Sequence, residues 1–135
     1  MSRIRRATIA VAAVVLAGVV AGVSAQQAGF SRTILQQADI SAPGREAVTA
    51  IAEIQPGASI GRHTHPGEEI GYVLEGTVTV EQEGKPAVSL GTGKTFLIPA
   101  GIPHGAANKG SVATRILATY IVEKGKPLAT PVAAR

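Results

Sequence analysis

The sequence predicts an all-β protein, a sandwich or barrel built from many short strands. Glycine and proline recur at roughly ten-residue intervals after residue 31, as turns between short strands require. The runs between them are rich in valine, isoleucine, threonine and alanine. After residue 25, no apolar pattern with the helical period of about 3.6 residues continues far enough to form a core helix. At 135 residues, the chain has room for one such domain.

Nine segments between the turn signals are expected to form strands. In chain order they are Thr33–Gln37, Glu46–Gln55, Ser59–His65, Glu69–Leu74, Thr77–Glu81, Ala87–Leu90, Thr95–Ile98, His104–Asn108 and Val112–Val122. From the second strand onward, the turn signals that precede them are Pro43-Gly44, Pro56-Gly57, Pro66-Gly67, Gly76, Gly84-Lys85-Pro86, Gly91-Thr92-Gly93, Pro99-Ala100-Gly101 and Gly110. Gly76 and Gly101 are expected in hairpin turns that need a positive φ.

The strand pattern also predicts the organisation of the domain. The barrel is expected over residues 44–122, after an N-terminal arm over residues 26–43. Residues 123–135 contain two prolines and are expected to form an extended C-terminal arm over the surface.

The first 25 residues have the pattern of a secretory signal peptide. Arg3, Arg5 and Arg6 precede an apolar run from Ile9 to Val23, which ends in small residues up to Ala25. The alternative is an uncleaved membrane anchor, but the run is shorter than the roughly 20 residues that span a bilayer. We therefore expect cleavage after Ala25 and a periplasmic or secreted mature protein.

Charge and composition argue against several classes of function. The net charge is +4, but three of the 13 basic residues lie in the first six positions, which leaves ten against nine acidic residues. The body of the protein is therefore nearly neutral and has few aromatic residues to stack on bases, so we expect no nucleic-acid partner. Since the chain has no cysteine, disulfides and thiolate metal sites are impossible.

All three histidines and one carboxylate are candidate metal ligands. His63 and His65 share one face of an extended strand, because side chains alternate along it. Pro66-Gly67 then reverses the chain, so that Glu69 is expected beside them on the neighbouring antiparallel strand. His104 must arrive by tertiary folding. Imidazole nitrogen and carboxylate oxygen suit first-row divalent metals, so one mononuclear site is predicted, with Mn, Fe, Co, Ni, Cu or Zn as candidates.

Other residues near these ligands carry weaker expectations. Gly71 lies on the inward face if Glu69 points inward, and would leave space beside the metal. Tyr72 alternates away from Glu69 and is expected to pack rather than to meet a substrate. Phe96 and Leu97 are assigned to the core, and core packing is the default for Tyr120. The interior is expected to be small and mostly apolar, with no inward cluster of arginine or lysine and no catalytic residue that the sequence identifies.

Two motifs give the chain a family resemblance. Residues Gly57 to Gly76 fit the pattern G-x5-H-x-H-x3-E-x6-G, and Gly93 to Asn108 fit G-x5-P-x-G-x2-H-x3-N. The chain resembles a small single-domain cupin. The resemblance implies a double-stranded β-helix (jelly-roll) barrel in which the three histidines and Glu69 bind the metal and Asn108 is structural. It also implies that two copies form a homodimer through edge strands, such as Thr33–Gln37, or through terminal arms.

Three classes of function remain open. The first is a metal-dependent enzyme of the dioxygenase, lyase or isomerase type that acts on a small molecule and uses the metal as a Lewis acid. The second is a non-catalytic barrel of the cell envelope that binds a small ligand or the metal itself. The third is an envelope protein in which the metal only stabilises the barrel. Because one fold supports many activities, the motifs alone do not choose among them.

Overall fold

The computed structural model describes residues 27–133, and this part of the chain is all β. It contains no helix, so no described helix is long and apolar enough to cross a membrane. The predicted signal peptide, residues 1–25, lies outside the described residues. The strands are β1 (Phe30–Asp39), β2 (Arg45–Ile54), β3 (Ser59–Thr64), β4 (Gly67–Glu75), β5 (Thr77–Gln82), β6 (Val88–Gly91), β7 (Thr95–Ile98), β8 (His104–Ala107), β9 (Thr114–Glu123) and β10 (Thr130–Pro131).

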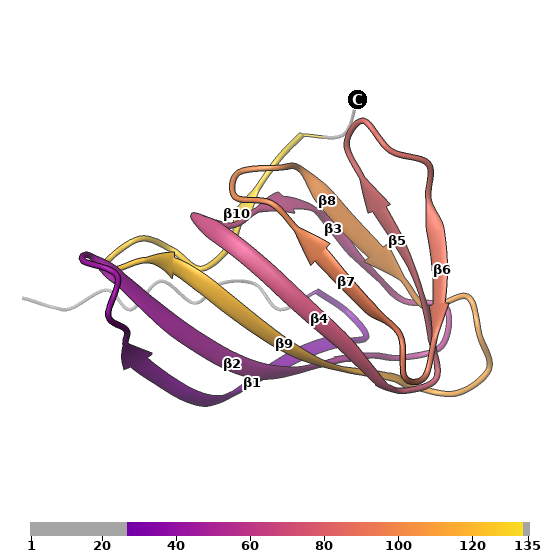
Figure 1. Ribbon diagram of the computed structural model, residues 1–135. Coiled ribbons are helices and arrows are strands. Elements are labelled where there is room, and N and C mark those ends of the chain that lie inside the picture. Colours follow the sequence, from indigo (N-terminus) through magenta and orange to yellow (C-terminus); the bar gives the residue numbers. More distant parts are fainter. Residues whose placement is uncertain (1–26, 134–135) are drawn as a thin grey trace, which may run out of the picture.

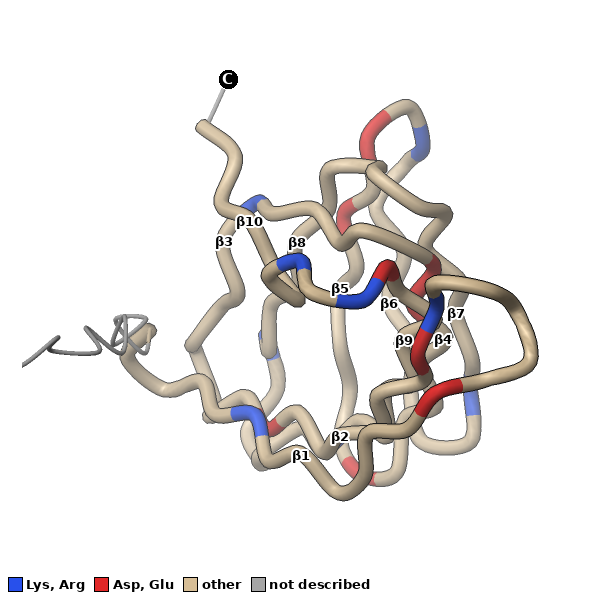
Figure 2. Tube along the Cα trace, turned by 90° about the vertical axis from the view of Figure 1, so that its left-hand side faces the viewer, with Lys and Arg blue, Asp and Glu red and all other residues tan. Residues whose placement is uncertain are grey.

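The strands form two five-stranded sheets that face each other across the interior (Figures 1 and 2). We call them the first sheet, in the order β1-β2-β9-β4-β7, and the second sheet, in the order β10-β3-β8-β5-β6. Every neighbouring pair of strands is antiparallel. The all-β prediction is therefore confirmed. All nine predicted segments overlap a strand, and β10 is a short additional strand in the tail.

Most connections carry the chain from one sheet to the other, which corrects the hairpins that the sequence predicted. Only β1–β2 and β5–β6 are consecutive strands that pair with each other. Gly76 and Gly101 do have positive φ values of 75° and 71°, but each lies between strands of opposite sheets. A Cβ on Gly76 would also lie 2.7 Å from the Ala113 carbonyl oxygen, so this corner requires glycine on two grounds.

The core lies between the sheets and follows the alternation of the long strands. In β2 and β9, which pair along their whole length, every second side chain is buried. Fully burying a side chain such as Ile54 or Ile98 stabilises the fold by about 1.5–3 kcal/mol. The buried apolar residues are Val48, Ala50, Ala52, Ile54, Val73, Val78, Val80, Ile98, Ile116, Ala118, Tyr120 and Val122.

Candidate metal centre

The four predicted ligands come together inside the barrel, from both sheets. His63 on β3 and His104 on β8 are register partners in the second sheet, and His65 lies just past the end of β3. Glu69 projects from β4 in the first sheet. All four are buried, with exposed fractions between 3% and 8%. The prediction that His63 and His65 share an inward face is confirmed.

Glu69 reaches the cluster by a different route from the predicted one. The Pro66-Gly67 segment does not close a hairpin, because β3 and β4 belong to opposite sheets. It carries the chain across the end of the barrel, so Glu69 faces the histidines from the other sheet. Gly67 is required there for close approach, since a Cβ would lie 1.8 Å from the Ile121 carbonyl oxygen on β9.

The candidate ligand atoms lie close enough to share one ion. Each histidine offers one ring nitrogen and Glu69 offers one carboxylate oxygen, and these four atoms all lie within 4.8 Å of one another. Oε2 of Glu69 is 3.1 Å from Nε2 of both His65 and His104. For bonds of about 2.1 Å, ligands on opposite sides of an ion are about 4.2 Å apart, so the cluster is near coordination size.

Backbone carbonyls hold one nitrogen of each imidazole. Nδ1 lies 2.7 Å from the Gly61 oxygen in His63, 2.5 Å from the Leu128 oxygen in His65 and 2.9 Å from the Ile102 oxygen in His104. A carbonyl can only accept, so each Nδ1 donates and each neutral ring keeps its lone pair on Nε2. Nε2 of His65 is buried and makes no hydrogen bond, although Glu69 is near. An orphaned buried lone pair of this kind fits a metal ligand.

The electrostatics of the cluster favour the forms that bind metals. Burial lowers the pKa of His63 to about 4. The neighbouring histidines also lower this pKa, whereas the hydrogen bond to Gly61 raises it. For Glu69, burial raises the pKa, but the contacts of its Oε2 with the rings of His104 and His65 outweigh it and lower the pKa to about 2. At neutral pH the cluster therefore contains a carboxylate and an uncharged His63, as coordination requires.

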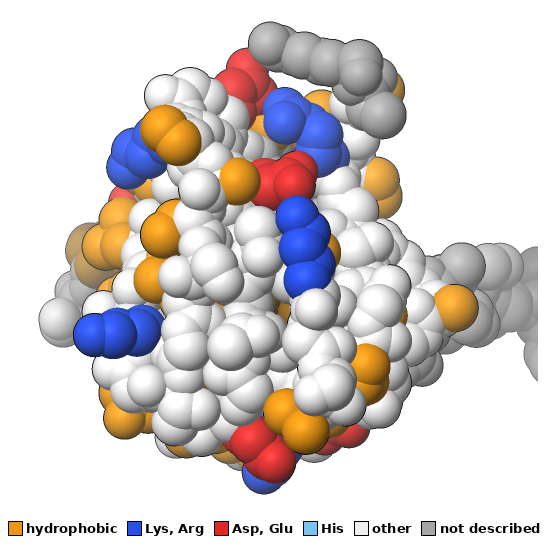
Figure 3. Space-filling view, turned by 90° about the vertical axis from the view of Figure 1, so that its right-hand side faces the viewer, with side chains coloured by type: hydrophobic (Ala, Val, Ile, Leu, Met, Phe, Trp, Pro, Cys, Tyr) orange, Lys and Arg blue, Asp and Glu red, His pale blue; other side chains and the backbone are white. Residues whose placement is uncertain are grey.

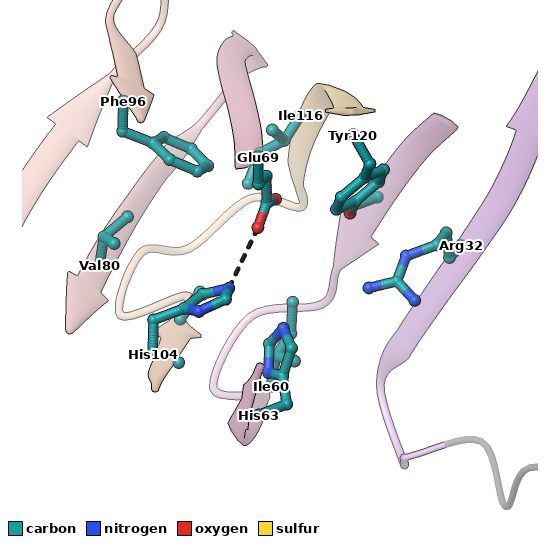
Figure 4. Close-up of a pocket in the computed structure, with 12 residues that line it drawn as sticks. Arg32, Ile60, His63, Glu69, Val80, Phe96, His104, Ile116 and Tyr120 are labelled. Atoms are coloured by element: carbon teal, nitrogen blue, oxygen red, sulfur yellow. Dashed lines mark hydrogen bonds and ion pairs between the residues drawn. The ribbon is translucent and has the colours of Figure 1, made fainter. Parts of the chain in front are cut away.

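A cavity adjoins the cluster and has a mostly apolar wall, as predicted (Figure 4). Its volume is about 370 Å³, including the open mouth. The apolar side chains that line it come from both sheets: Ala52, Ile60, Val80, Phe96, Ala106 and Ile116.

The sequence predicted core packing for Tyr120, which is confirmed, but it assigned neither Tyr120 nor Arg32 to this cavity. Tyr120 is 1% exposed, is the register partner of Glu69 on β9, and packs its ring 4.7 Å from that of His65. Burial and the Glu69 carboxylate raise its pKa, while Arg32 lowers it, so its hydroxyl stays protonated. Arg32 enters from β1 (Figure 4). Alternation places Tyr120 inward, but only the pairing of β4 with β9 reveals that it meets Glu69.

The structure corrects the expectations for Gly71 and Leu97. A Cβ on Gly71 would lie 2.1 Å from Cζ of Phe96, so the space beside Gly71 is filled by the phenyl ring and not left for a ligand. Phe96 packs against the core, but Leu97 alternates outward and is 54% exposed. Tyr72 also points outward, with an exposed fraction of 43%.

Asn108 is structural, as the resemblance implied. It is 1% exposed and its amide nitrogen donates to the carbonyl oxygens of Ile54 and Val112, at 2.9 and 2.8 Å. Its side-chain oxygen accepts from the Gly110 N–H at 2.9 Å. The residue thus ties the β8–β9 connection to the end of β2.

Comparison with known proteins gives the same family. The cupin domain model Cupin_2 matches residues 50–120, more than half of the chain. The transcriptional regulator PuuR of Escherichia coli K12, of the HTH type, is 35% identical over 79 residues, which are 58% of this chain and 42% of PuuR. The chain therefore spans about two fifths of the length of the curated relatives that it matches.

Solved structures share the fold at lower identity. A protein with a double-stranded β-helix domain from Klebsiella pneumoniae has a TM-score of 0.64 and 18% identity, over 79% of this chain and 87% of that one. The DMSP lyase DddQ from Ruegeria pomeroyi has a TM-score of 0.65 and 22% identity, over 76% of this chain and 51% of the lyase. With its two-sheet barrel and the match over residues 50–120, this chain belongs to the cupin domain family.

Proposed function

We propose that this protein binds one divalent transition metal through His63, His65, Glu69 and His104, and that it is a metal-dependent enzyme acting on a small molecule. The observation that carries the proposal is the set of three buried imidazoles with Nδ1 held by backbone carbonyls, together with a buried carboxylate. Mn, Fe, Co, Ni, Cu and Zn all suit these donors.

The chain supplies a small, enclosed site for such chemistry. The bound ion would act as a Lewis acid toward an oxygen of the substrate. Four protein ligands leave positions open on a six-coordinate ion, and the apolar cavity wall restricts water around them. A reaction of the dioxygenase, lyase or isomerase type fits this arrangement, and the likeness in fold to a DMSP lyase supports the lyase class as one candidate.

Metal analysis of variants tests the ligand assignment. We expect His65→Ala and Glu69→Ala to lose most of the metal found in the wild type by elemental analysis, while circular dichroism still shows a β-barrel. Glu68→Ala is the matched control, because Glu68 is half-buried on the opposite face of the same strand and should keep its metal. Full metal occupancy in Glu69→Ala would reject the assignment.

A second candidate is a barrel that binds a small ligand without turnover. This candidate is favoured by the similarity over 79 residues to PuuR, which is described as a transcriptional regulator and not as an enzyme. Metal-loaded protein would be assayed for oxygen uptake and for turnover of β-diketones, flavonols and hydroxy acids. Retention of an organic ligand without turnover would support the binding barrel. Protein that is inert and ligand-free but loses thermal stability on chelation would support a purely structural metal.

We further propose that the protein is exported and that it does not bind nucleic acid. The basic start and apolar run of residues 1–25 support export. N-terminal sequencing of protein from the cell envelope tests cleavage after Ala25, and a mature N-terminus other than Gln26 would argue against it.

Basic and acidic side chains are intermixed on the face in Figure 3, and neither sign covers that face alone. Absence of any gel shift with DNA or RNA at low salt is the expected result.

A further inference from the structure

Arg32 is a positive charge placed at the edge of the metal cluster. It lies on β1 opposite Ala52 of β2, and both residues line the cavity that contains His63 and Glu69. Figure 4 shows its guanidinium directed from β1 toward Tyr120 and His63. Among the described residues, it is the only lysine or arginine that lines this cavity.

The protein leaves this guanidinium without a carboxylate partner. Arg62, Arg115, Lys124 and Lys126 each form an ion pair, but no acidic group of residues 27–133 lies within ion-pair distance of Arg32. Its Nε is buried and has no hydrogen-bond partner. Arg32 as a whole is half-buried, and a charge that is partly withdrawn from water gains from pairing with an anionic group.

The neighbouring aromatic residues contact the guanidinium by their rings, and the Tyr120 hydroxyl interacts with one of its donors, but Nε has no partner. The central carbon lies 5.4 Å from the ring centroid of Phe30 and 5.5 Å from that of Tyr120, within the range of cation–π contacts. These rings hold the plane of the group in place. The N–H bonds of a guanidinium lie in its plane, and their fork matches the two oxygens of a carboxylate.

The charge of the site selects the same kind of ligand. This step rests on the proposed function, because it includes the bound ion. A divalent cation with one carboxylate, neutral imidazoles and Arg32 would leave the pocket with two net positive charges. A bound anion would offset this positive charge, and the attraction is strong because the dielectric constant in the pocket is low. A neutral molecule of equal size would gain no such attraction. The small cavity restricts that anion to a few heavy atoms beyond its carboxylate.

We propose that the pocket binds a small carboxylate, with Arg32 holding the carboxylate group and a second oxygen of the ligand directed at the His63–His65–Glu69–His104 cluster. Arg32 is then the residue that sets the substrate class of this barrel. It acts on the ligand directly, and its removal leaves the four metal ligands in place.

Calorimetric titration of the metal-loaded protein tests this assignment with glycolate, a small hydroxycarboxylate, and glycolamide, its uncharged counterpart of nearly the same size. We expect the wild type to bind glycolate at least tenfold more tightly than glycolamide. Arg32→Gln should weaken glycolate binding about 10- to 100-fold, the usual effect of losing a charge-assisted pair, and leave glycolamide binding unchanged. Arg32→Lys should retain part of the preference, because it keeps the charge and loses the fork.

Two measurements separate this inference from the proposed function. Metal content is determined for every variant, with Arg115→Gln as the control, since Arg115 is an exposed arginine paired with Glu53. If the wild type and Arg32→Gln both take up metal and bind glycolate with equal affinity, the role of Arg32 is overturned and the metal site is not. No discrimination between glycolate and glycolamide by the loaded wild type would do the same. A wild type that takes up no metal would overturn the proposed function, and the inference with it.

Discussion

His63, His65 and His104 each use one ring nitrogen for the fold and leave the other for coordination. The carbonyl oxygens of Gly61, Leu128 and Ile102 accept from Nδ1, so the rings keep their orientation without a metal. Such outer hydrogen bonds fix both tautomer and ring direction. The arrangement is therefore organised before the ion arrives, which lowers the cost of binding it.

The sequence predicted the metal cluster better than the rest of the pocket. Alternation placed His63 and His65 on one face, and the two motifs named Glu69 and His104, but the predicted hairpin that should bring Glu69 to the histidines was wrong. Arg32 lies before the first predicted strand, and its contact with Tyr120 depends on how β1 and β9 flank β2. No local pattern contains that pairing.

The stability of the metal-free protein should depend on pH through two groups of the cluster. The pKa of His63 is about 4 in the fold and 6.5 as its ordinary value, so the unfolded chain binds more protons between these limits. Its contribution is present above about pH 6.5 and is lost as the pH falls toward 4. Glu69, with a pKa lowered from 4.5 to about 2, adds a further loss below about pH 4.5.

Denaturant unfolding in the presence of a chelator checks this prediction. The free energy of unfolding should fall steadily as the pH is lowered from about 7 to about 4. His63→Gln should flatten the upper part of that decline, because it removes the group that titrates there. A wild-type stability that stays constant over this range would contradict the assigned pKa of His63.

At the scale of elements, strand positions could be predicted from the sequence, whereas strand partners could not. Alternation and turn residues are local, so all nine predicted segments overlap strands. Pro66-Gly67, Gly76 and Gly101 were expected to close hairpins, yet each connects opposite sheets. A glycine permits a sharp change of direction but does not specify which strand the chain meets next.

The C-terminal tail is an element that supports the metal cluster. Thr130 and Pro131 in β10 pair with Thr64 and His63 of β3, and the Leu128 carbonyl accepts from Nδ1 of His65. The sequence predicted an extended arm over the surface that could also contribute to a dimer, and it did not predict these contacts with β3 and His65. Its prolines gave no sign of this role, because the contact is made by a backbone oxygen that any residue carries.

Removal of the tail should weaken metal binding. A protein that ends after Lys126 lacks the acceptor for His65, and its affinity for the metal should fall about 10- to 100-fold in a competition titration with a chelator. A protein that ends after Pro131 retains Leu128 and β10 and serves as the control. Equal affinity in the two truncated proteins would show that the Leu128 contact does not position His65.

At the scale of the whole molecule, the core and the pocket share one barrel but use different parts of it. The buried residues of β2 and β9 that form the core include Val48, Ile54 and Val122, which do not line the metal cavity. The fold therefore has apolar burial that is independent of the ion. This division explains why ligand variants are expected to lose metal and still form a barrel.

The edge of the first sheet carries apolar surface that a second copy would cover. Among the strands of residues 27–133, β1 pairs only with β2, and its exposed side chains include Ile34 at 47% and Leu35 at 56%. Edge strands with exposed apolar residues favour pairing with another chain. We therefore propose the homodimer that the family resemblance implied, with β1 at its interface.

Light scattering of purified variants tests this interface. We expect the wild type to be a dimer and Leu35→Glu to be a monomer, because a carboxylate at a buried apolar interface would be desolvated without a partner. Val112→Glu is the control, since Val112 is 55% exposed in the β8–β9 connection and is not part of β1. Leu97→Glu tests the rival surface, where Leu97 lies beside Ile70 on the outer side of β7 and β4. A monomer with Leu97→Glu and a dimer with Leu35→Glu would move the interface from the sheet edge to that outer face.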